Sequence, residues 1–462
     1  MTDVRIEHDL LGDREVPADA LYGVQTLRAL ENFHISDVRL HHFPSLVQAL
    51  AYVKHAAART NQRLGGLDKT KADAIAKACA EIENGEHHEH FVVDLIQGGA
   101  GTSTNMNANE VIANRGLEIL GHRRGEYEFL HPNNDVNFGQ STNDVYPTAV
   151  RLAMLLSFPD LADAMRRLID ALRAKGEEFE HILKMGRTQM QDAVPMTVGQ
   201  EFHAWATTIS EDVERLTRTA RFFQEINMGA TAIGTGITTD PKYASLVVEE
   251  LTRITGKEFT LAADLVEATS DTGAFVTFSS VLKRIAVKIS KICNDLRLLS
   301  SGPRAGFNEI NLPAVQPGSS IMPGKVNPVI PEVVNQVAFQ VIGNDLTVTL
   351  AAEGGQLQLN AFEPVIAYNI LDSTRIMTRA MRTLRTHCIE GITVNEEVLA
   401  GNLERSIGII TALVPVIGYA ASTEIASQAL HTGKPVRDIV RESGLVSEGH
   451  LDEILTPARM TQ

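Results

Sequence analysis

A polar loop rich in glycine and proline holds the side chains of this sequence that are best suited to chemistry. Residues 316–328 contain two glycines and three prolines, so they cannot form the interior of a helix. The loop carries the hydroxyls of Ser319 and Ser320, the ammonium of Lys325 and the amide of Asn327. A polar loop between long helices is a common place for a segment that closes over a site. A flexible surface connector is the alternative, and the two apolar residues at the centre of the loop argue against it.

Two further loops repeat this combination of hydroxyls and amides. Residues 97–104 place three glycines ahead of Thr102, and a helix is expected to begin near Asn105. Small residues with free N–H groups before a helix suit an anion, and the density of hydroxyls favours this over an ordinary N-cap. Residues 141–143 precede a helix expected from Val145, where they can cap the helix, bind a carboxylate or do both.

A fourth polar joint precedes a helix that the pattern predicts over residues 197–228. Thr188 and Gln189 supply a hydroxyl and an amide there. Arg187 by itself would be a helix-end charge, but beside these two residues it becomes a candidate contact for a substrate. The candidate binding residues of the four loops are Thr102, Ser141, Thr142, Asn143, Thr188, Gln189, Ser320, Lys325 and Asn327.

The chemistry that fits these loops is the stabilisation of negative charge. Many neutral donors together with a lysine suit a small di-anion and an intermediate in which negative charge grows. Removal of a proton next to a carboxylate gives such an intermediate, an enediolate. A base in a flexible loop and a fixed set of donors are the parts that this reaction needs.

Other kinds of site find little support in the sequence. The run His87-His88-Glu89-His90 lacks the i, i+4 spacing of a helical zinc site, and we expect a solvated loop there and no metal site. The four polar loops contain no set of Cys, His and Asp ligands. The chain also shows no Ser-His-Asp order, no phosphate-binding loop after a strand and no dinucleotide-binding pattern.

Long helices are needed to position these loops. Apolar residues recur at steps of four and three over 209–226 and again over 282–299, which is the pattern of a heptad seam. With helical segments near 146–173 and 329–350, these rods predict a long central antiparallel helical bundle and a mainly α fold with few strands. The expected domains are an N-terminal domain (1–140), the central bundle (141–395) and a small C-terminal helical domain (396–462).

The N-terminal part is expected to be simpler. Residues 1–45 are polar and interrupted by glycine and proline, so they predict an extended arm with short turns. Two helices are expected over 46–64 and 70–84, on either side of a Gly-Gly pair.

Composition narrows the class of protein further. The chain has 462 residues and a formal net charge of −15 without a long basic run, which argues against nucleic acid or an anionic membrane as a partner. Three cysteines are too few for a disulfide framework and fit a reducing cytosol. The first residues lack the apolar core of a secretory signal, and no stretch approaches 18 consecutive apolar residues. We therefore expect a cytoplasmic protein that acts on a small molecule.

The loop around Ser319 also carries a resemblance. The run from Gly318 to Asn327, Gly-Ser-Ser-Ile-Met-Pro-Gly-Lys-Val-Asn, resembles the signature of the fumarase/aspartase superfamily. Gln189 stands where hydratases of the superfamily typically carry His, and the sequence is more similar to the aspartase (aspartate ammonia-lyase) family than to the class II fumarate hydratases. Other matching segments cover nearly the whole chain: 6–17, 22–26, 97–110, 140–148, 186–200, 229–236, 329–336 and 354–360.

The resemblance implies a fold, an activity and roles. It implies the fumarase/aspartase-like helical bundle, a homotetramer whose active sites are each shared by three subunits, and reversible deamination of L-aspartate to fumarate and ammonia. Ser319 would be the general base and Asn143 would contact the amino group, while Ser320 would support the loop. Thr102, Ser141, Thr142, Thr188, Lys325 and Asn327 would hold the carboxylates and the enediolate. No cofactor would be required, although a divalent cation could activate the enzyme.

Two departures from the family pattern limit what the resemblance implies. Asn134-Asp135 replaces the Asp-His pair of the family. The resemblance therefore does not imply a secondary dicarboxylate site at this loop. Thr238 stands where an Asn is usual, so a polar contact there can differ. Three hypotheses are retained: an aspartase, another lyase of the superfamily, chiefly fumarate hydratase, and a non-catalytic helical scaffold such as the lens crystallins related to the superfamily. The complete set of site residues argues against the third.

Overall fold

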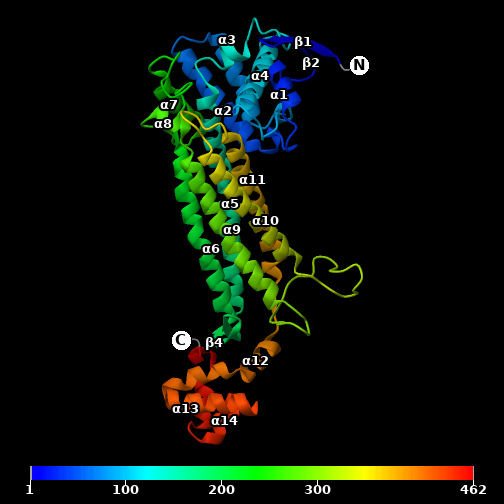
Figure 1. Ribbon diagram of the computed structural model, residues 1–462, viewed down its shortest axis with the longest axis vertical. Coiled ribbons are helices and arrows are strands. Elements are labelled where there is room, and N and C mark those ends of the chain that lie inside the picture. The colour runs from blue at the N-terminus through cyan, green and yellow to red at the C-terminus, as the bar shows by residue number, and fades with distance from the viewer. Residues whose placement is uncertain (1–2, 461–462) are drawn as a thin grey trace. The chain divides into compact units, whose positions relative to one another are not determined.

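The computed structural model describes residues 3–460 and confirms a mainly α fold (Figure 1). Its strands form four two-stranded sheets. By their contacts the residues fall into two compact units, each made of three segments: unit 1 (1–162, 215–284 and 340–376) and unit 2 (163–214, 285–339 and 377–462). Five long helices have residues in both units: α5 (Thr142–Glu178), α6 (Val198–Ala220), α9 (Gly273–Leu299), α10 (Val329–Glu353) and α11 (Glu363–His387). The predicted three-domain division stays a prediction.

Unit 1 contains a group of shorter helices packed around α2 (Pro44–Arg63). α3 (Lys69–Glu83), α4 (Thr102–Ile119) and α7 (Tyr243–Thr255) each contact it (Figure 1). Alanine and leucine form the buried side of α2, and small side chains of this kind let helices approach closely. The carboxylate of Asp68 caps the next helix by accepting the N–H groups of its first turn. The helices predicted over 46–64 and 70–84 are thus confirmed, each beginning slightly earlier than expected.

The prediction of an extended N-terminal arm is only partly right. The strands β1 (Val4–Asp9) and β2 (Gly12–Pro17) form an antiparallel hairpin, and α1 (Val24–Asn32) follows. The turn of the hairpin contains Gly12 at φ 103°, a conformation that suits glycine. The arm is folded because the strands pair with each other and because Val16 and Val24 share a small buried cluster.

In unit 2 the hairpin of β3 (Leu183–Thr188) and β4 (Gln191–Thr197) adjoins a cluster of C-terminal helices (Figure 1). Met185 of β3 is 1% exposed and belongs to the core of that cluster. The predicted small helical C-terminal region is present as α12 (Glu396–Arg405), α13 (Ile410–Thr432), α14 (Val436–Ser443), α15 (Glu448–Ile454) and α16 (Pro457–Met460).

The predicted helix 197–228 is shorter than expected. α6 ends at Ala220, and a 3-10 turn leads into the two-residue strand β5 (Glu225–Ile226).

The helical stretch Ile407–Thr432, which includes α13, is long and apolar enough to cross a membrane, with a mean hydropathy of 1.6. Its backbone leaves the helical region at Gly418 (φ 80°, ψ 162°), so two shorter helices meet there. Leu413 and Ile425 face the C-terminal core, whereas Tyr419 and Leu430 are exposed. A single helix of this kind is weak support for a membrane span, because core helices of other proteins pass the same test.

All three cysteines are free and buried. Cys79 lies on α3 in unit 1, whereas Cys293 on α9 and Cys388 after α11 lie in unit 2. Burial raises the pKa of each thiol, to about 12 for Cys388. The expectation of no disulfide framework stays a prediction.

Candidate active site

The predicted binding residues at 141–143 lie at the first turn of α5, in unit 1. The buried carboxylate of Asp144 organises this turn. It accepts hydrogen bonds from the backbone N–H groups of Ser141 at 3.0 Å, Gly229 at 3.1 Å and Thr231 at 3.0 Å. One carboxylate therefore joins the start of α5 to segment 229–236, one of the segments that resemble the family. Burial raises the pKa of Asp144 to about 6, and its backbone hydrogen bonds oppose that shift.

A buried lysine lies beneath the same turn. Lys54 on α2 is 0% exposed, and its Nζ donates to Asn137 Oδ1 at 2.8 Å and to Gln140 Oε1 at 2.9 Å. Asn105 Nδ2 donates to Asn137 Oδ1 at 3.1 Å and to the hydroxyl of Thr142 at 3.2 Å. Burial lowers the pKa of Lys54 to about 7, and the charge of Asp144 opposes the shift. Through the side-chain amides of Asn137 and Asn105, the buried ammonium of Lys54 is thus connected to the hydroxyl of Thr142, a predicted binding residue.

The amide of Asn143 is oriented by its neighbours. Its Nδ2 donates to the carbonyl oxygen of Ala232 at 2.7 Å, and its own carbonyl accepts Asn227 Nδ2 at 3.0 Å. With Nδ2 occupied in this way, Oδ1 is the atom of the side chain that can accept a hydrogen bond from a ligand. This geometry suits an ammonium group.

Thr102 is the first residue of α4 and is exposed, and its hydroxyl donates to the carbonyl of Gly99 at 2.8 Å. Gly101 precedes it at φ 91°, and a Cβ at that position would lie 2.5 Å from the ring of Tyr146 on α5. Glycine is therefore needed for this loop to lie against α5. Unit 1 contains two of the four predicted polar loops, 97–104 and 141–143, together with the family-matching segment 229–236.

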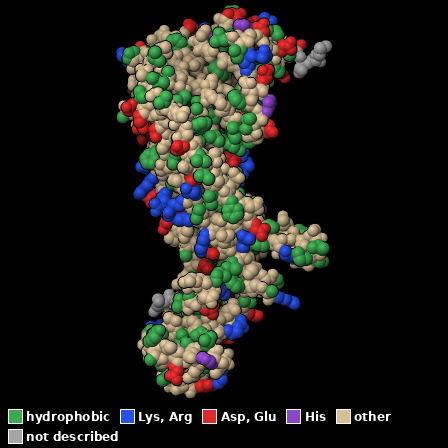
Figure 2. Space-filling view, in the orientation of Figure 1, with side chains coloured by type: hydrophobic (Ala, Val, Ile, Leu, Met, Phe, Trp, Pro, Cys, Tyr) green, Lys and Arg blue, Asp and Glu red, His purple; other side chains and the backbone are tan. Residues whose placement is uncertain are grey.

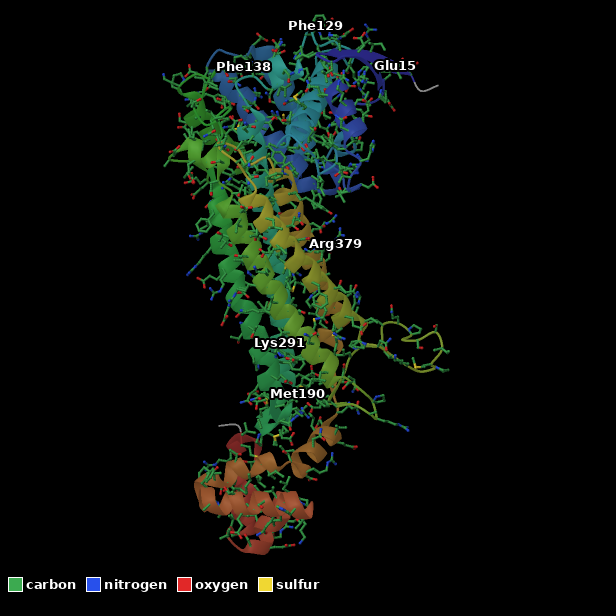
Figure 3. All side chains as sticks on the ribbon, in the orientation of Figure 1. Glu15, Phe129, Phe138, Met190, Lys291 and Arg379 are labelled. Carbon is green, nitrogen blue, oxygen red and sulfur yellow. The ribbon has the colours of Figure 1, made fainter. Side chains whose placement is uncertain are left out.

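Thr188 and Gln189 lie at the turn of the β3–β4 hairpin in unit 2, and both are exposed. Met190, labelled in Figure 3, is the other residue of this turn. The guanidinium of Arg187 lies 2.6 Å from Glu309 Oε1 and 4.6 Å from the centre of the Phe307 ring. That guanidinium already has protein partners, so a substrate contact by Arg187 stays a prediction.

The predicted base Ser319 lies in a loop of unit 2 that bonds mainly to itself. Its Oγ accepts the backbone N–H groups of Ile321 at 3.2 Å and Met322 at 2.9 Å, contacts that favour the ionised form of a hydroxyl. Asn327 Nδ2 donates to the carbonyl of Gly318 at 2.6 Å and closes the loop at its base. The loop extends away from the ends of α9 and α10 in unit 2, and hydrophobic side chains show at its outer end (Figures 1 and 2). Ile321 is 83% exposed.

A cavity of about 720 Å³ lies beside this loop within unit 2. Lys325 and Asn327 line one part of it, while Arg297, Ser300 and Ser301 line another. Lys325 and its neighbour Ser320 are exposed. The cavity has the polar lining and cationic groups expected of a place where a small anion binds.

The described residues offer one group that could hold a metal ion, and it lies away from the predicted binding residues in sequence. Ligand atoms of Glu81, Glu86 and His87 lie within 4.8 Å of one another. Glu81 is already paired with Arg115 and with His87, as an ordinary surface ion-pair network would be. His87 belongs to the run that the sequence suggested as a solvated loop.

Comparisons with known proteins identify the family. Residues 12–343 match the family described as Lyase, and residues 409–462 match the family described as Fumarase C C-terminus. The chain belongs to the lyase family of fumarases and aspartases. The predicted resemblance is therefore confirmed over most of the sequence.

Relatives within this lyase family are similar over nearly their whole length. The chain is 64% identical to the aspartate ammonia-lyase of Pseudomonas aeruginosa over 457 residues, which cover 99% of this chain and 96% of the relative. It is 55% identical to that of Escherichia coli (strain K12) over 455 residues, covering 98% and 95%.

Solved structures of the family have the same fold. A fumarate lyase:delta crystallin from Brucella melitensis, bound to cobalt, is 59% identical with a TM-score of 0.97, and the match covers 100% of both chains. A class II fumarase from Schistosoma mansoni is 35% identical with a TM-score of 0.92, and 99% of each chain is covered. The predicted fumarase/aspartase-like helical fold is thus confirmed.

Three buried charged residues escaped the sequence analysis: Lys54, Asp144 and Glu309. Each is at most 1% exposed, and each contacts a segment that carries predicted site residues. The signal for Lys54 was present, since it stands among apolar residues at positions of α2 that should face a core. The partners of Asp144 and Glu309 are distant in sequence, so no local pattern could reveal them.

Proposed function

We propose that this lyase is an aspartate ammonia-lyase, which converts L-aspartate reversibly to fumarate and ammonia. The main support is the 64% identity to an enzyme of that name over almost the full chain. In the forward reaction Ser319, as an alkoxide, takes the proton from the carbon beside the β-carboxylate. The electron pair moves onto that carboxylate and forms an enediolate. The pair then returns to form the carbon–carbon double bond as the bond to nitrogen breaks and ammonia leaves.

The roles of the other residues follow from their chemistry. Oδ1 of Asn143 accepts a hydrogen bond from the substrate amino group, because Nδ2 donates to the carbonyl oxygen of Ala232. Lys325 supplies positive charge to the enediolate, while Ser320 and Gln189 border the base and the binding hydroxyls. Hydroxyls and amides bind the carboxylates: Thr102, Ser141, Thr142, Thr188 and Asn327. Fixed donors of this kind stabilise charge that develops during the reaction.

The fumarate hydratase is the second candidate, and the 35% identity to a class II fumarase supports it. An assay for fumarate by its ultraviolet absorbance, with L-aspartate or L-malate as substrate, separates the two. We expect deamination of aspartate with negligible dehydration of malate, because Gln189 stands where hydratases of the superfamily typically carry His. Efficient turnover of malate alone would identify a hydratase, and inactivity on both would favour a non-catalytic scaffold.

The proposed chemistry uses hydroxyls, amides and one ammonium, so it includes no step that requires a metal or an organic cofactor. Activation by a divalent cation is compatible with it. We expect activity to persist in the presence of a chelator. Complete loss that added metal reverses would contradict this part of the proposal.

For the assembly we propose a D₂ homotetramer in which three subunits contribute to each site. Exposed apolar side chains on α10 support a partner surface: Leu346 and Leu350 in unit 1 are 60% and 61% exposed, and Phe339 in unit 2 is 62% exposed. The remaining partners are small molecules, without nucleic acid or membrane, and a cytoplasmic location fits the net charge of −15.

Mixed tetramers test the shared site. Ser319→Ala and Thr188→Ala chains, each nearly inactive alone, are denatured together and refolded. Roughly a quarter of the sites should receive both native residues if different chains supply them. Recovery of no activity, in mixed tetramers shown to have formed, would place both residues in one chain.

A further inference from the structure

Unit 2 contains a buried cluster of opposite charges that the proposed reaction does not use. Glu309 is 1% exposed and lies between two cations, with Oε2 3.0 Å from Lys184 Nζ and Oε1 2.6 Å from Arg187 Nη1. Lys184 also pairs with Glu201 of α6 at 2.7 Å. Two positive and two negative side chains thus balance, and a carboxylate at this depth is stable only with such partners.

Both cations belong to the strand that ends at Thr188. Lys184 and Arg187 lie on β3, one on each side of a bulge in the β3–β4 pairing. Gly186 lies within the bulge, where a Cβ would approach the carbonyl oxygen of Val194 to 2.9 Å. A bulge re-aims the residues that follow it. Glu309 therefore forms ion pairs with two residues of the hairpin, Lys184 and Arg187, just before its turn.

The turn itself has an uncommon backbone. Gln189 and Met190 occupy left-handed conformations at φ 52° and 65°, and neither is Gly, Asn or Asp, the residues that favour such a turn. A left-handed conformation is unfavourable for such residues, because it brings Cβ close to the following carbonyl oxygen. A turn of this kind persists when the structure around it holds it in place.

Glu309 also belongs to the segment that leads to the serine loop. Its N–H donates to the carbonyl of Leu299 at the end of α9, and its own carbonyl accepts the N–H of Asn395, both at 2.9 Å. The strand β7 (Ile310–Asn311) follows at once and pairs with β8 (Thr393–Val394). The backbone of Glu309 is thus held by hydrogen bonds on two sides. Its carboxylate in turn holds the β3–β4 hairpin through Lys184 and Arg187.

We propose that Glu309 is a positioning residue for the reaction, acting through Lys184 and Arg187 to hold Thr188 and Gln189 in their binding geometry. The inference rests on the proposed deamination of aspartate, because it assigns Thr188 to the substrate. Stability alone is a weak explanation for the cluster, since buried ion pairs often contribute little to the free energy of folding. We therefore attribute the cluster to positioning: it fixes the place of the turn residues Thr188 and Gln189.

A double-mutant cycle with Thr188→Ala tests the inference in the intact enzyme. Glu309→Gln keeps the shape of the side chain and removes its charge. We expect kcat/KM for L-aspartate to fall about 10- to 100-fold, because misplacement of a binding group by about 1 Å can have an effect of this size. In the Thr188→Ala background the same change should lower kcat/KM less than about 3-fold, since the group that it positions is already gone.

Asp345→Asn is the matched control, because Asp345 is also a buried carboxylate paired with a lysine, Lys283. We expect its effect on kcat/KM to be the same in both backgrounds. Glu309→Asp, which keeps the charge, should retain more activity than Glu309→Gln. Equal losses from Glu309→Gln with and without Thr188 would overturn the inference.

Hydrogen–deuterium exchange of residues 183–197 gives a readout that does not depend on the reaction. We expect faster exchange in Glu309→Gln than in the native chain and no change in Asp345→Asn. Unchanged exchange would overturn the positioning role even if activity fell. A native enzyme without aspartate turnover would instead refute the proposed function. If Glu309→Gln does not fold, Arg187→Lys, which loses the planar fork, should show the same coupling to Thr188→Ala, and its absence would likewise overturn the inference.

Discussion

Ser141, Thr142 and Asn143 rest on buried polar side chains, whereas Ser319 lies in a loop that bonds mainly to itself. Beneath the first group lie a lysine that is 0% exposed and a carboxylate that is also 0% exposed. Around Ser319 the contacts are backbone N–H groups of its own loop. In the proposed reaction the two regions have different tasks: residues 141–143 bind the substrate at fixed positions, and the loop of Ser319 supplies the base.

The largest effect is expected from the loop. Ser319→Ala removes the proposed base, and we expect the rate of deamination to fall by about 10³-fold or more. The free energy of unfolding should hardly change, because the hydrogen bonds of its hydroxyl join only residues of the same exposed loop. Steady-state kinetics and denaturant unfolding measure the two quantities.

Ser320→Ala is the control for this experiment, since it alters a neighbouring hydroxyl of the same loop. We expect a clearly smaller loss of activity from it. A Ser319→Ala enzyme with near-normal turnover would show that another group is the base and would break the comparison.

A change beneath the other region should affect activity and stability together. Lys54→Met removes the donor to Asn137 and Gln140 and the positive charge that favours the ionised form of Asp144. We expect kcat/KM to fall about 10- to 100-fold and the melting temperature to drop, because unpaired buried acceptors are unfavourable. Kinetics and thermal unfolding of the same preparation test this.

Lys77→Met on α3 is the matched control, since Lys77 is exposed. It should leave both quantities nearly unchanged. A Lys54→Met enzyme with native stability and lower activity would show that the lysine acts on the substrate and not on residues 141–143.

The smallest effect on activity is expected from a change that alters how the stability of unit 1 depends on pH. Glu363, the first residue of α11, is buried, its Oε2 has no hydrogen-bond partner, and burial raises its pKa from the ordinary 4.5 to about 8. Between these values the native chain keeps a proton that the unfolded chain releases. The free energy of unfolding from this group is therefore full below pH 4.5 and is lost as the pH rises toward 8.

Glu363→Gln stays neutral and should remove this dependence. Relative to the native chain, the variant should gain about 1.4 kcal/mol per pH unit between pH 5 and pH 8, measured by denaturant unfolding. Glu249→Gln, at an exposed position of α7, should show no such gain. Parallel pH profiles for Glu363→Gln and the native chain would contradict the prediction.

The sequence predicted the helices and polar loops well because those features are local. Periodicity marked α6 and α9, and glycine with proline marked the loop of Ser319. It failed where contacts between distant residues decide the structure. The arm proved to be a hairpin because its strands pair with each other, and the strand that carries Lys184 and Arg187 was missed because its pairing and its buried partner Glu309 come from elsewhere in the chain.

The buried cysteines can report when each unit opens, because each unit contains at least one of them. Only a thiolate reacts quickly with an alkylating reagent, and burial withholds all three thiols from solvent. Cys79 should be labelled when the helices around it in unit 1 open, and Cys293 and Cys388 when their surroundings in unit 2 open. Mass spectrometry of pulse-labelled chains can therefore time the opening of unit 1 and of unit 2 separately, without adding a probe to the native sequence.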